Sequence, residues 1–165
     1  MTSLHTLSLS LHLVALAFWL GGMAFFLIVF APAAHDLEQA AAVLMLNQGR
    51  RSFEVISWAA IAVLFLTGIF SLVLRVQASG VPVTTGYTVV LSLKLFLFFA
   101  MLIHHCLQVF KYGPKIAAET AQLPCKISAW PESLLFHWRK WFFLLKINAA
   151  IGPIVTLLGL MLAGM

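Results

Sequence analysis

Ionisable side chains lie inside stretches of this sequence that are otherwise apolar, and they are the residues best placed to do chemistry. His12, Arg75 and Lys94 each fall in such a stretch, and the adjacent His104 and His105 share the stretch of Lys94. A charged group at the centre of a membrane helix costs about 2.5 to 3.5 kcal/mol on the insertion scale, so it normally faces the bundle interior and serves a purpose. The sequence therefore predicts functional sites inside a helical bundle.

Imidazoles that face a bundle interior, with basic groups in reach, have the chemistry needed to hold a b-type haem. His12 would supply one axial nitrogen, and a neutral Lys94 or a histidine of the same stretch as Lys94 would supply the other. Arg75 would meet a propionate. Trp19 shares the helical stripe of His12, because a seven-residue step returns to nearly the same side of a helix. The predicted cofactor-binding residues are therefore His12, Trp19, Arg75, Lys94, His104 and His105.

The same side chains also suit a copper ion, because imidazole and sulfur groups are borderline or soft ligands. His12 and His105 are the predicted metal ligands, and Cys106 directly follows His105. Neighbouring helical residues diverge by about 100 degrees, however, so His105 and Cys106 would chelate one ion poorly. Met23 and Met101 are isolated in the sequence, and we interpret them as apolar packing. A cofactor-free interpretation also stays open, in which the histidines only form hydrogen bonds within the bundle.

Composition indicates the elements that position these residues. Hydrophobic residues make up 62% of the chain, charged residues only 9%, and the mean hydropathy is +1.03, so lipid is the expected solvent. The first apolar run has no Lys or Arg before it, and we expect it to be a mature helix rather than a signal peptide. The prediction is an all-α fold, one integral membrane bundle of four transmembrane helices over residues 1–165, with spans at about 9–30, 53–76, 87–110 and 138–163.

Positive charge predicts the orientation of this bundle. Most of the basic residues fall in or beside two expected loops, one before residue 53 and one between residues 110 and 138. By the positive-inside rule these loops are cytoplasmic, so both termini would lie in the periplasm of a bacterial inner membrane. The bilayer is the expected partner, and no nucleic acid is expected. The residues are Arg50, Arg51, Lys111, Lys115, Lys126, Arg139 and Lys140.

Depth along the helices separates the candidate residues into two groups. His12, Arg75 and Lys94 are expected in an outer pocket, and His104 and His105 near the cytoplasmic face, a gap of ~20 Å at about 1.5 Å per residue. Glu54, His137 and Lys146 are expected at the depth of this inner group. One iron could not easily bind histidines from both groups.

The order of several short motifs resembles the CopD-like membrane domain. His12, Trp19, Gly21, Gly22 and Pro32 match its first helix. The match continues in order through Arg51-Ser52-Phe53-Glu54, Thr67-Gly68, Thr85-Gly86-Tyr87, Leu93-Lys94 and Asn148.

The sequence is also similar to the HemJ-like membrane protoporphyrinogen oxidases, which likewise pair a first-helix His with a third-helix Lys. It departs from them at Asn148-Ala149-Ala150-Ile151, where those proteins carry Asn-Glu-x-Pro, so the acidic partner is missing.

The resemblance implies a four-helix membrane domain linked to copper handling or to haem b and electron transfer, with His12 and Lys94 as principal site residues. The leading hypothesis is a membrane redox protein that holds haem b and exchanges electrons with a quinone or an electron-transfer protein. This hypothesis leaves open whether the chain is itself an oxidoreductase. The alternatives are a copper uptake or tolerance protein, and a cofactor-free accessory subunit that packs in a homo- or hetero-oligomer.

Overall fold

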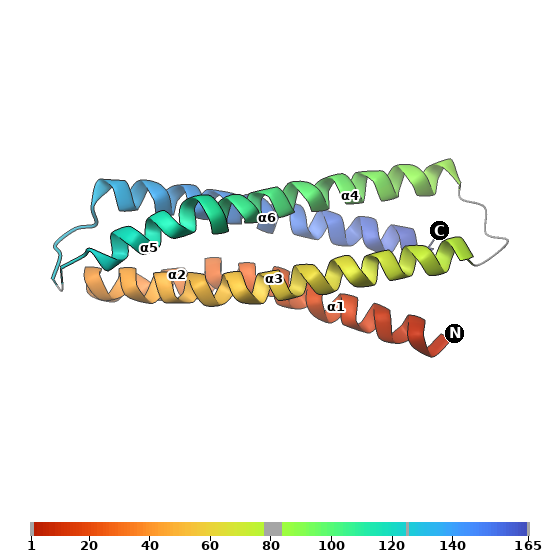
Figure 1. The fold of residues 1–165 in the computed structure, drawn as a ribbon, viewed down its shortest axis with the longest axis horizontal. Coiled ribbons are helices and arrows are strands. Elements are labelled where there is room, and N and C mark those ends of the chain that lie inside the picture. Colours follow the sequence, from red (N-terminus) through yellow and green to blue (C-terminus); the bar gives the residue numbers. More distant parts are fainter. Residues whose placement is uncertain (1, 78–83, 125, 165) are drawn as a thin grey trace.

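The computed structural model describes residues 2–77, 84–124 and 126–164. These residues form helices joined by short connections, with no strand among them (Figure 1). In this part of the chain, four helical rods are long and apolar enough to cross a membrane. The predicted all-α fold with four such helices is therefore confirmed. The rods are Leu4–Ala34, Gln39–Gln77, Thr85–Ala121 and Glu132–Leu162.

Two of the rods are composite. The first joins two α-helices through a π-helical turn, η1, and the third does so through a second π-helical turn, η2. The second and fourth rods are single α-helices, α3 and α6. The bounds are α1 (Thr2–Phe25), η1 (Phe26–Phe30), α2 (Ala31–Ala34), α3 (Gln39–Gln77), α4 (Thr85–Cys106), η2 (Leu107–Tyr112), α5 (Gly113–Ala121) and α6 (Glu132–Gly164).

The π-helical turns explain how these two rods pass through a proline. Pro32 lies in the first turn of α2 and Pro114 in the first turn of α5, each just after a π-helical turn. A proline inside an α-helix lacks an N–H and its ring clashes with the carbonyl four residues earlier. In both rods that carbonyl belongs to the wider π-turn, which accommodates the ring. The rods therefore continue beyond residues 30 and 110, where the expected spans end.

Helix α3 begins well before residue 53, where the second span was expected to start. The sequence analysis placed Arg50 and Arg51 in a loop, and this expectation is wrong because both lie within α3. The segment before Phe53 is rich in residues that favour helices, such as Ala, Leu, Gln and Arg. Its charge is also satisfied locally, since Arg50 binds Asn47 and Glu54 on the same helical face.

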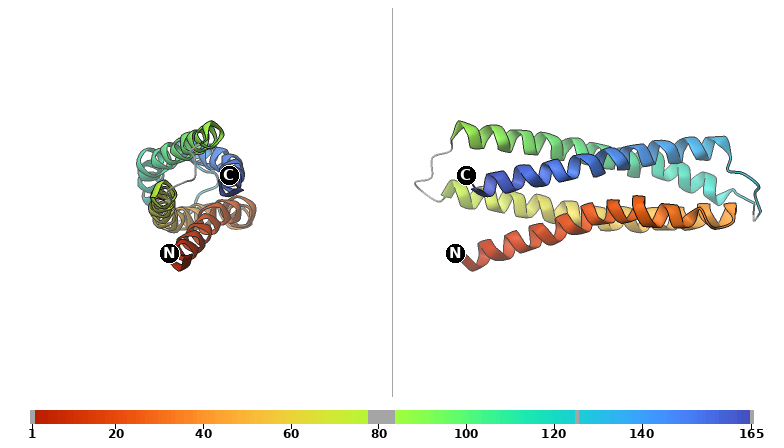
Figure 2. Two further views of the ribbon diagram at one scale, coloured as in Figure 1. Left: turned by 90° about the vertical axis from the view of Figure 1, so that its right-hand side faces the viewer. Right: turned by 180° about the vertical axis from the view of Figure 1, so that it is seen from behind.

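The rods pack as two pairs. In one pair α1 packs along α3, and in the other α4 packs along α6 (Figures 1 and 2). The pairs are joined by contacts of α1 with α6 and of α5 with α3; α5 also contacts α6. α3 and α4 follow one another in the chain, and their backbones do not pack closely within the described residues, although side chains of α3 reach Tyr87 and His105 of α4. Figure 2 shows the N-terminal part of α1 diverging from the other helices.

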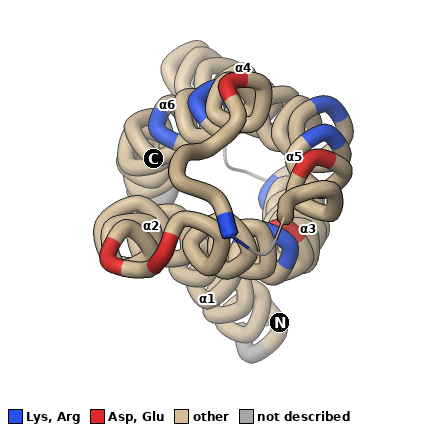
Figure 3. Tube along the Cα trace, turned by 90° about the vertical axis from the view of Figure 1, so that its left-hand side faces the viewer, with Lys and Arg blue, Asp and Glu red and all other residues tan. Residues whose placement is uncertain are grey.

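The two ends of the bundle differ in charge. We call the end that carries both chain termini the terminal end, and the opposite end, with α2 and α5, the charged end (Figure 1). Figure 3 looks onto the charged end, where Lys, Arg, Asp and Glu lie on several of the helices. Around the bundle, large apolar side chains such as Phe18, Ile28 and Phe96 are exposed, as expected of a surface that faces lipid.

Candidate functional site

The terminal half of the bundle holds His12 in a defined hydrogen bond. Its Nδ1 lies 2.7 Å from the Thr67 hydroxyl oxygen. That hydroxyl also lies 2.6 Å from the carbonyl oxygen of Val63 and 3.2 Å from that of Leu64, and when it donates its single proton to either carbonyl it accepts from His12. In that arrangement the neutral imidazole carries its proton on Nδ1, which leaves the lone pair on Nε2. This is the form of histidine that binds a metal ion through Nε2.

Lys94 lies close to the same place. It lies within electrostatic range of His12, and its Nζ would be 3.1 Å from a Cβ built at Gly159 of α6. The side chain is half-buried and makes no hydrogen bond or ion pair with the described residues. The four rods thus each contribute one residue here, and we call His12, Thr67, Lys94 and Gly159 the terminal-end site.

Trp19 and Arg75 lie near this site without joining it. Trp19 is 2% exposed and makes an edge-to-face contact with Phe98, with the ring centroids 6.1 Å apart. Arg75 stacks over the Tyr87 ring at 4.1 Å and donates to the carbonyl oxygen of Leu162 at 3.4 Å. Eight residues of α3 separate Arg75 from Thr67, or about 12 Å along the helix. Arg75 therefore ties α3 to α4 and α6.

His104 and His105 face different partners deeper in the bundle. Asn148 donates from Nδ2 to the carbonyl oxygen of Met101 at 3.0 Å, so its Oδ1 accepts from His104 Nδ1, also at 3.0 Å. His105 is 1% exposed and lies between the rings of Phe53 and Trp58, at centroid distances of 6.3 and 5.2 Å. Its Nε2 makes no hydrogen bond of ordinary length among the described residues, but the ring interacts with the side chain of Gln108, one turn further along the same rod.

The structure separates His12 from His105. His12 contacts Thr67 of α3, whereas His105 contacts Trp58, nine residues earlier in the same helix. That interval corresponds to about 14 Å along the helix axis at ~1.5 Å per residue. A single metal ion cannot bind both imidazoles. The predicted site residues thus divide between two depths of the bundle.

A buried ion pair that was not predicted from the sequence lies at the charged end. Arg50, which is 3% exposed, donates from Nη1 to Glu54 Oε1 at 2.6 Å and from Nη2 to Asn47 Oδ1 at 2.8 Å. A Cβ built at Gly113 would lie 2.7 Å from Arg50 Nη1, so α5 approaches the pair where it has no side chain. The i, i+4 spacing of Arg50 and Glu54 predicts such a pair on a helix, but Arg50 was expected in a loop.

The other residues expected at this depth have separate environments. His137 lies beside Glu119, with Nδ1 and Oε1 3.1 Å apart, and Lys146 is exposed. Gln108 donates from Nε2 to the carbonyl oxygen of Trp141 at 3.1 Å. The expected grouping of Glu54 with His137 and Lys146 is replaced by these pairs.

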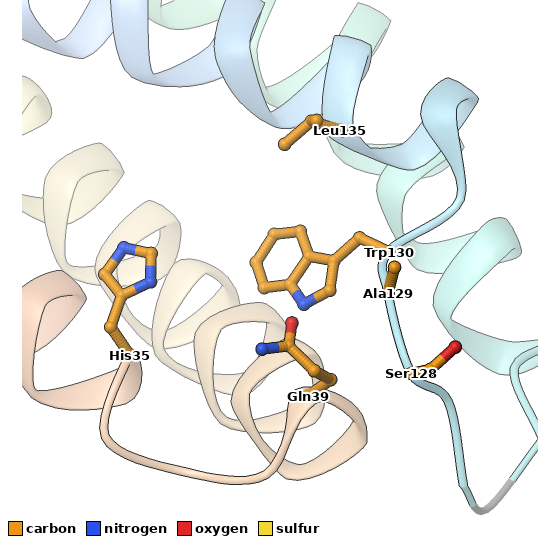
Figure 4. A pocket seen from close by; sticks show the side chains of 6 residues that line it. All are labelled: His35, Gln39, Ser128, Ala129, Trp130 and Leu135. Carbon is orange, nitrogen blue, oxygen red and sulfur yellow. The ribbon is translucent and has the colours of Figure 1, made fainter.

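An open hollow of about 390 Å³ lies at the charged end, away from His12 and His105. Figure 4 shows the Trp130 ring projecting into it toward Gln39, with His35 across the space. His35 and Gln39 are both exposed, so this is a surface depression rather than an internal site. It holds none of the predicted site residues.

Within the described residues, no group of three or more His, Cys, Asp or Glu side chains could hold a metal ion.

A family model described as copper resistance protein D matches residues 47–138, which is more than half of the chain. The matched range contains Arg75, Lys94, His104 and His105, while His12 precedes it. No curated protein and no solved structure matches the chain.

Proposed function

The chain belongs to the copper resistance protein D family, and we propose that it binds a copper ion inside its helical bundle as part of copper uptake or tolerance. The observation that carries this proposal is the hydrogen-bonded state of His12. When Thr67 accepts the proton of Nδ1, Nε2 presents its lone pair within a membrane-spanning bundle. Copper is the cargo in this proposal.

The surroundings of His12 support its role as a ligand. Histidines that bind metals almost always donate their other ring N–H to a neighbouring acceptor, which orients the ring and raises its basicity. Thr67 is that acceptor, and its own position is set by its bond to Val63. Imidazole binds both common oxidation states of copper. When neutral, the Lys94 amine is a second nitrogen donor at the same site.

The proposed orientation places this site toward the outer face of a bacterial inner membrane. Basic residues gather in the charged half of the bundle, so the positive-inside rule assigns the charged end to the cytoplasm. The terminal end would then face the periplasm with both termini. A copper ion arriving from outside would reach His12 before it reaches the deeper histidines.

Haem b is a second candidate because of the shape of α3 near Thr67. A Cβ built at Gly68 would meet no atom within 4 Å, and the backbones of α3 and α4 do not pack closely within the described residues. A flat ligand suits such a small-residue face, with His12 Nε2 and Lys94 Nζ as the nitrogens that would hold it. Bound haem would supply one-electron transfer, with a quinone or a redox protein as partner.

One preparation tests both candidates. The detergent-purified chain is exposed to copper, washed, and analysed for metal content, for its absorption spectrum and for haem by the pyridine haemochrome assay. We expect retained copper and no Soret band. A Soret band with stoichiometric haem and no retained copper would replace the copper proposal with the haem candidate. If the chain retains neither copper nor haem, both candidates are wrong.

Variants connect the result to His12. His12→Ala should lose the copper bound at the terminal-end site. Thr67→Val should weaken that binding about 10- to 100-fold, because it removes the acceptor that orients the ring. His5→Ala is the matched control, since His5 is an exposed histidine of the same helix. Equal copper affinity in His12→Ala and the unmodified chain would overturn the proposal.

A further inference from the structure

Three buried side chains that the site described above does not use lie deeper in the same bundle. Met23 of α1 and Met101 and His105 of α4 are each 1% exposed. Both methionines belong to the main hydrophobic core. We propose that the sulfurs of Met23 and Met101 and the imidazole of His105 form a second, inner site for copper in its monovalent state, Cu(I). The inference rests on the proposed copper function.

The two methionines lie at one depth. α1 and α4 both run from the terminal end toward the charged end (Figure 1). Trp19 of α1 touches Phe98 of α4, which sets the register between these two helices. Met23 lies four residues beyond Trp19 and Met101 three beyond Phe98, so their depths differ by only about 1.5 Å at 1.5 Å per residue. One turn inward of an observed contact, both side chains point into the core.

His105 shares this region. It lies four residues after Met101, and residues spaced by four occupy the same face of a helix. Its ring contacts Phe53, and a Cβ at Gly22, the neighbour of Met23, would lie 3.4 Å from that same Phe53 ring. Phe53 therefore places the α1 segment around Met23 and the His105 ring at one level.

The unpartnered nitrogen of His105 is what makes the cluster more than packing. Buried polar atoms normally find a hydrogen-bond partner, because a buried polar group without one is destabilising. His105 Nε2 makes no hydrogen bond of ordinary length among the described residues, although the ring is almost wholly buried and interacts with the Gln108 side chain, whose Oε1 is also unpartnered. A metal ion bound to this nitrogen would offset that destabilisation.

The donor set selects monovalent copper. Two thioethers and an imidazole are neutral, soft or borderline donors, which favour Cu(I) over harder divalent ions. The surrounding rings of Trp19, Phe53 and Trp58 make the region apolar, and an uncompensated double charge would cost more there than a single one. Met23 also lies eleven residues beyond His12, about 16 Å deeper on the same stripe, so the inner site would follow the terminal-end site along the bundle.

The test uses the full chain in detergent with Cu(I) supplied from a chromophoric chelator, and with Ag(I) as a probe that does not change oxidation state. We compare the unmodified chain with the double variant Met23→Leu/Met101→Leu, since leucine preserves the apolar volume. Met45→Leu is the control, because Met45 also packs against the core but lies in α3, away from the cluster. Copper K-edge X-ray absorption reports whether sulfur binds the ion.

We expect the double variant to lose a Cu(I) ion that shows sulfur ligation, while Met45→Leu keeps it. His12→Ala should retain this ion and lose only the ion at the terminal-end site. Unchanged Cu(I) affinity in the double variant, with no sulfur ligation in the unmodified chain, would overturn the inner site. If the inner site is overturned in this way but His12→Ala abolishes copper binding, the proposed copper function still holds, with His12 as its only site. If the unmodified chain binds no copper, both the inner site and the proposed function are wrong.

Discussion

The terminal and charged halves of the bundle are built differently. In the charged half, aromatic side chains fill the space between helices: Phe26 contacts Phe53, Trp141 and Phe142 at centroid distances of 5.8, 5.2 and 6.0 Å. In the terminal half, α1 diverges from its neighbours (Figure 2), and a Cβ at Gly68 would meet nothing within 4 Å. Aromatic contacts join the helices of the charged half, whereas α1 diverges from the other helices in the terminal half.

This difference suggests that the charged half stabilises the fold and that the terminal half binds and releases the ligand. Segments that admit and release a ligand are drawn from the less stable parts of a protein, because binding there requires local opening. The terminal half, with His12 and Lys94, has that character. The charged half holds the rods in register and buries the Arg50–Glu54 pair. Variants in the two halves should therefore act on different properties, and we order the tests from the largest expected effect to the smallest.

Removing one member of the buried ion pair should have the largest effect. Glu54→Ala leaves the buried Arg50 guanidinium without its carboxylate, and breaking such a pair typically costs about 3 to 5 kcal/mol. Thermal unfolding in detergent, followed by circular dichroism, measures the loss. Arg51→Ala is the control, because Arg51 is exposed beside the pair. Equal unfolding temperatures for Glu54→Ala and the unmodified chain would show that the charged half does not depend on this pair.

The same substitution at two glycines should have opposite effects in the two halves. Gly113→Ala places a Cβ 2.7 Å from Arg50 Nη1 and 3.2 Å from the carbonyl oxygen of Gln108, and such overpacking costs about 1 to 3 kcal/mol. Gly68→Ala meets no neighbour and should stabilise α3 by about 0.5 to 1 kcal/mol through its helix preference. The change in the thermal unfolding temperature of each variant shows whether it is stabilised or destabilised. A loss of stability in Gly68→Ala would mean that the terminal half is packed more closely than its geometry indicates.

The sequence predicted the rods because lipid imposes a simple rule: an apolar run of sufficient length must become a helix. It also predicted that His12 and Lys94 share a depth, since depth follows from the rise per residue and facing from helical periodicity. The family match confirms the resemblance read from the motifs.

Contacts between helices were not predictable in the same way. The expected boundary between loop and helix at residue 53 lay between Arg50 and Glu54, so the two were not recognised as a pair on one helix. Hydropathy detects where a helix becomes apolar rather than where it begins. The continuation past Pro32 and Pro114 depends on π-helical turns that no sequence pattern signalled. Met23 and Met101 are isolated in the sequence and lie at one depth only because Trp19 meets Phe98. Their relation depends on which helices touch, and one sequence does not contain that information.

The smallest effect is expected at Arg75, where the terminal half is tied together. Arg75→Gln removes a cation–π contact with Tyr87, worth about 0.5 to 1 kcal/mol at an accessible position, and a long hydrogen bond to Leu162. The midpoint temperature of thermal unfolding should therefore fall only slightly. Copper binding should be unchanged, since Arg75 lies about 12 Å along α3 from Thr67. Arg139→Gln, an exposed arginine of the charged half, is the control.

The same variant sharpens the choice between the two ligands of the terminal half. A copper ion held at His12 gains nothing from Arg75, whose guanidinium is already engaged by Tyr87 and Leu162. A haem in the same half would need a cation for its propionates, and Arg75 is the nearest arginine on α3. If Arg75→Gln lowers ligand retention while Arg139→Gln does not, the terminal half binds an anionic ligand, and the copper proposal for His12 is wrong.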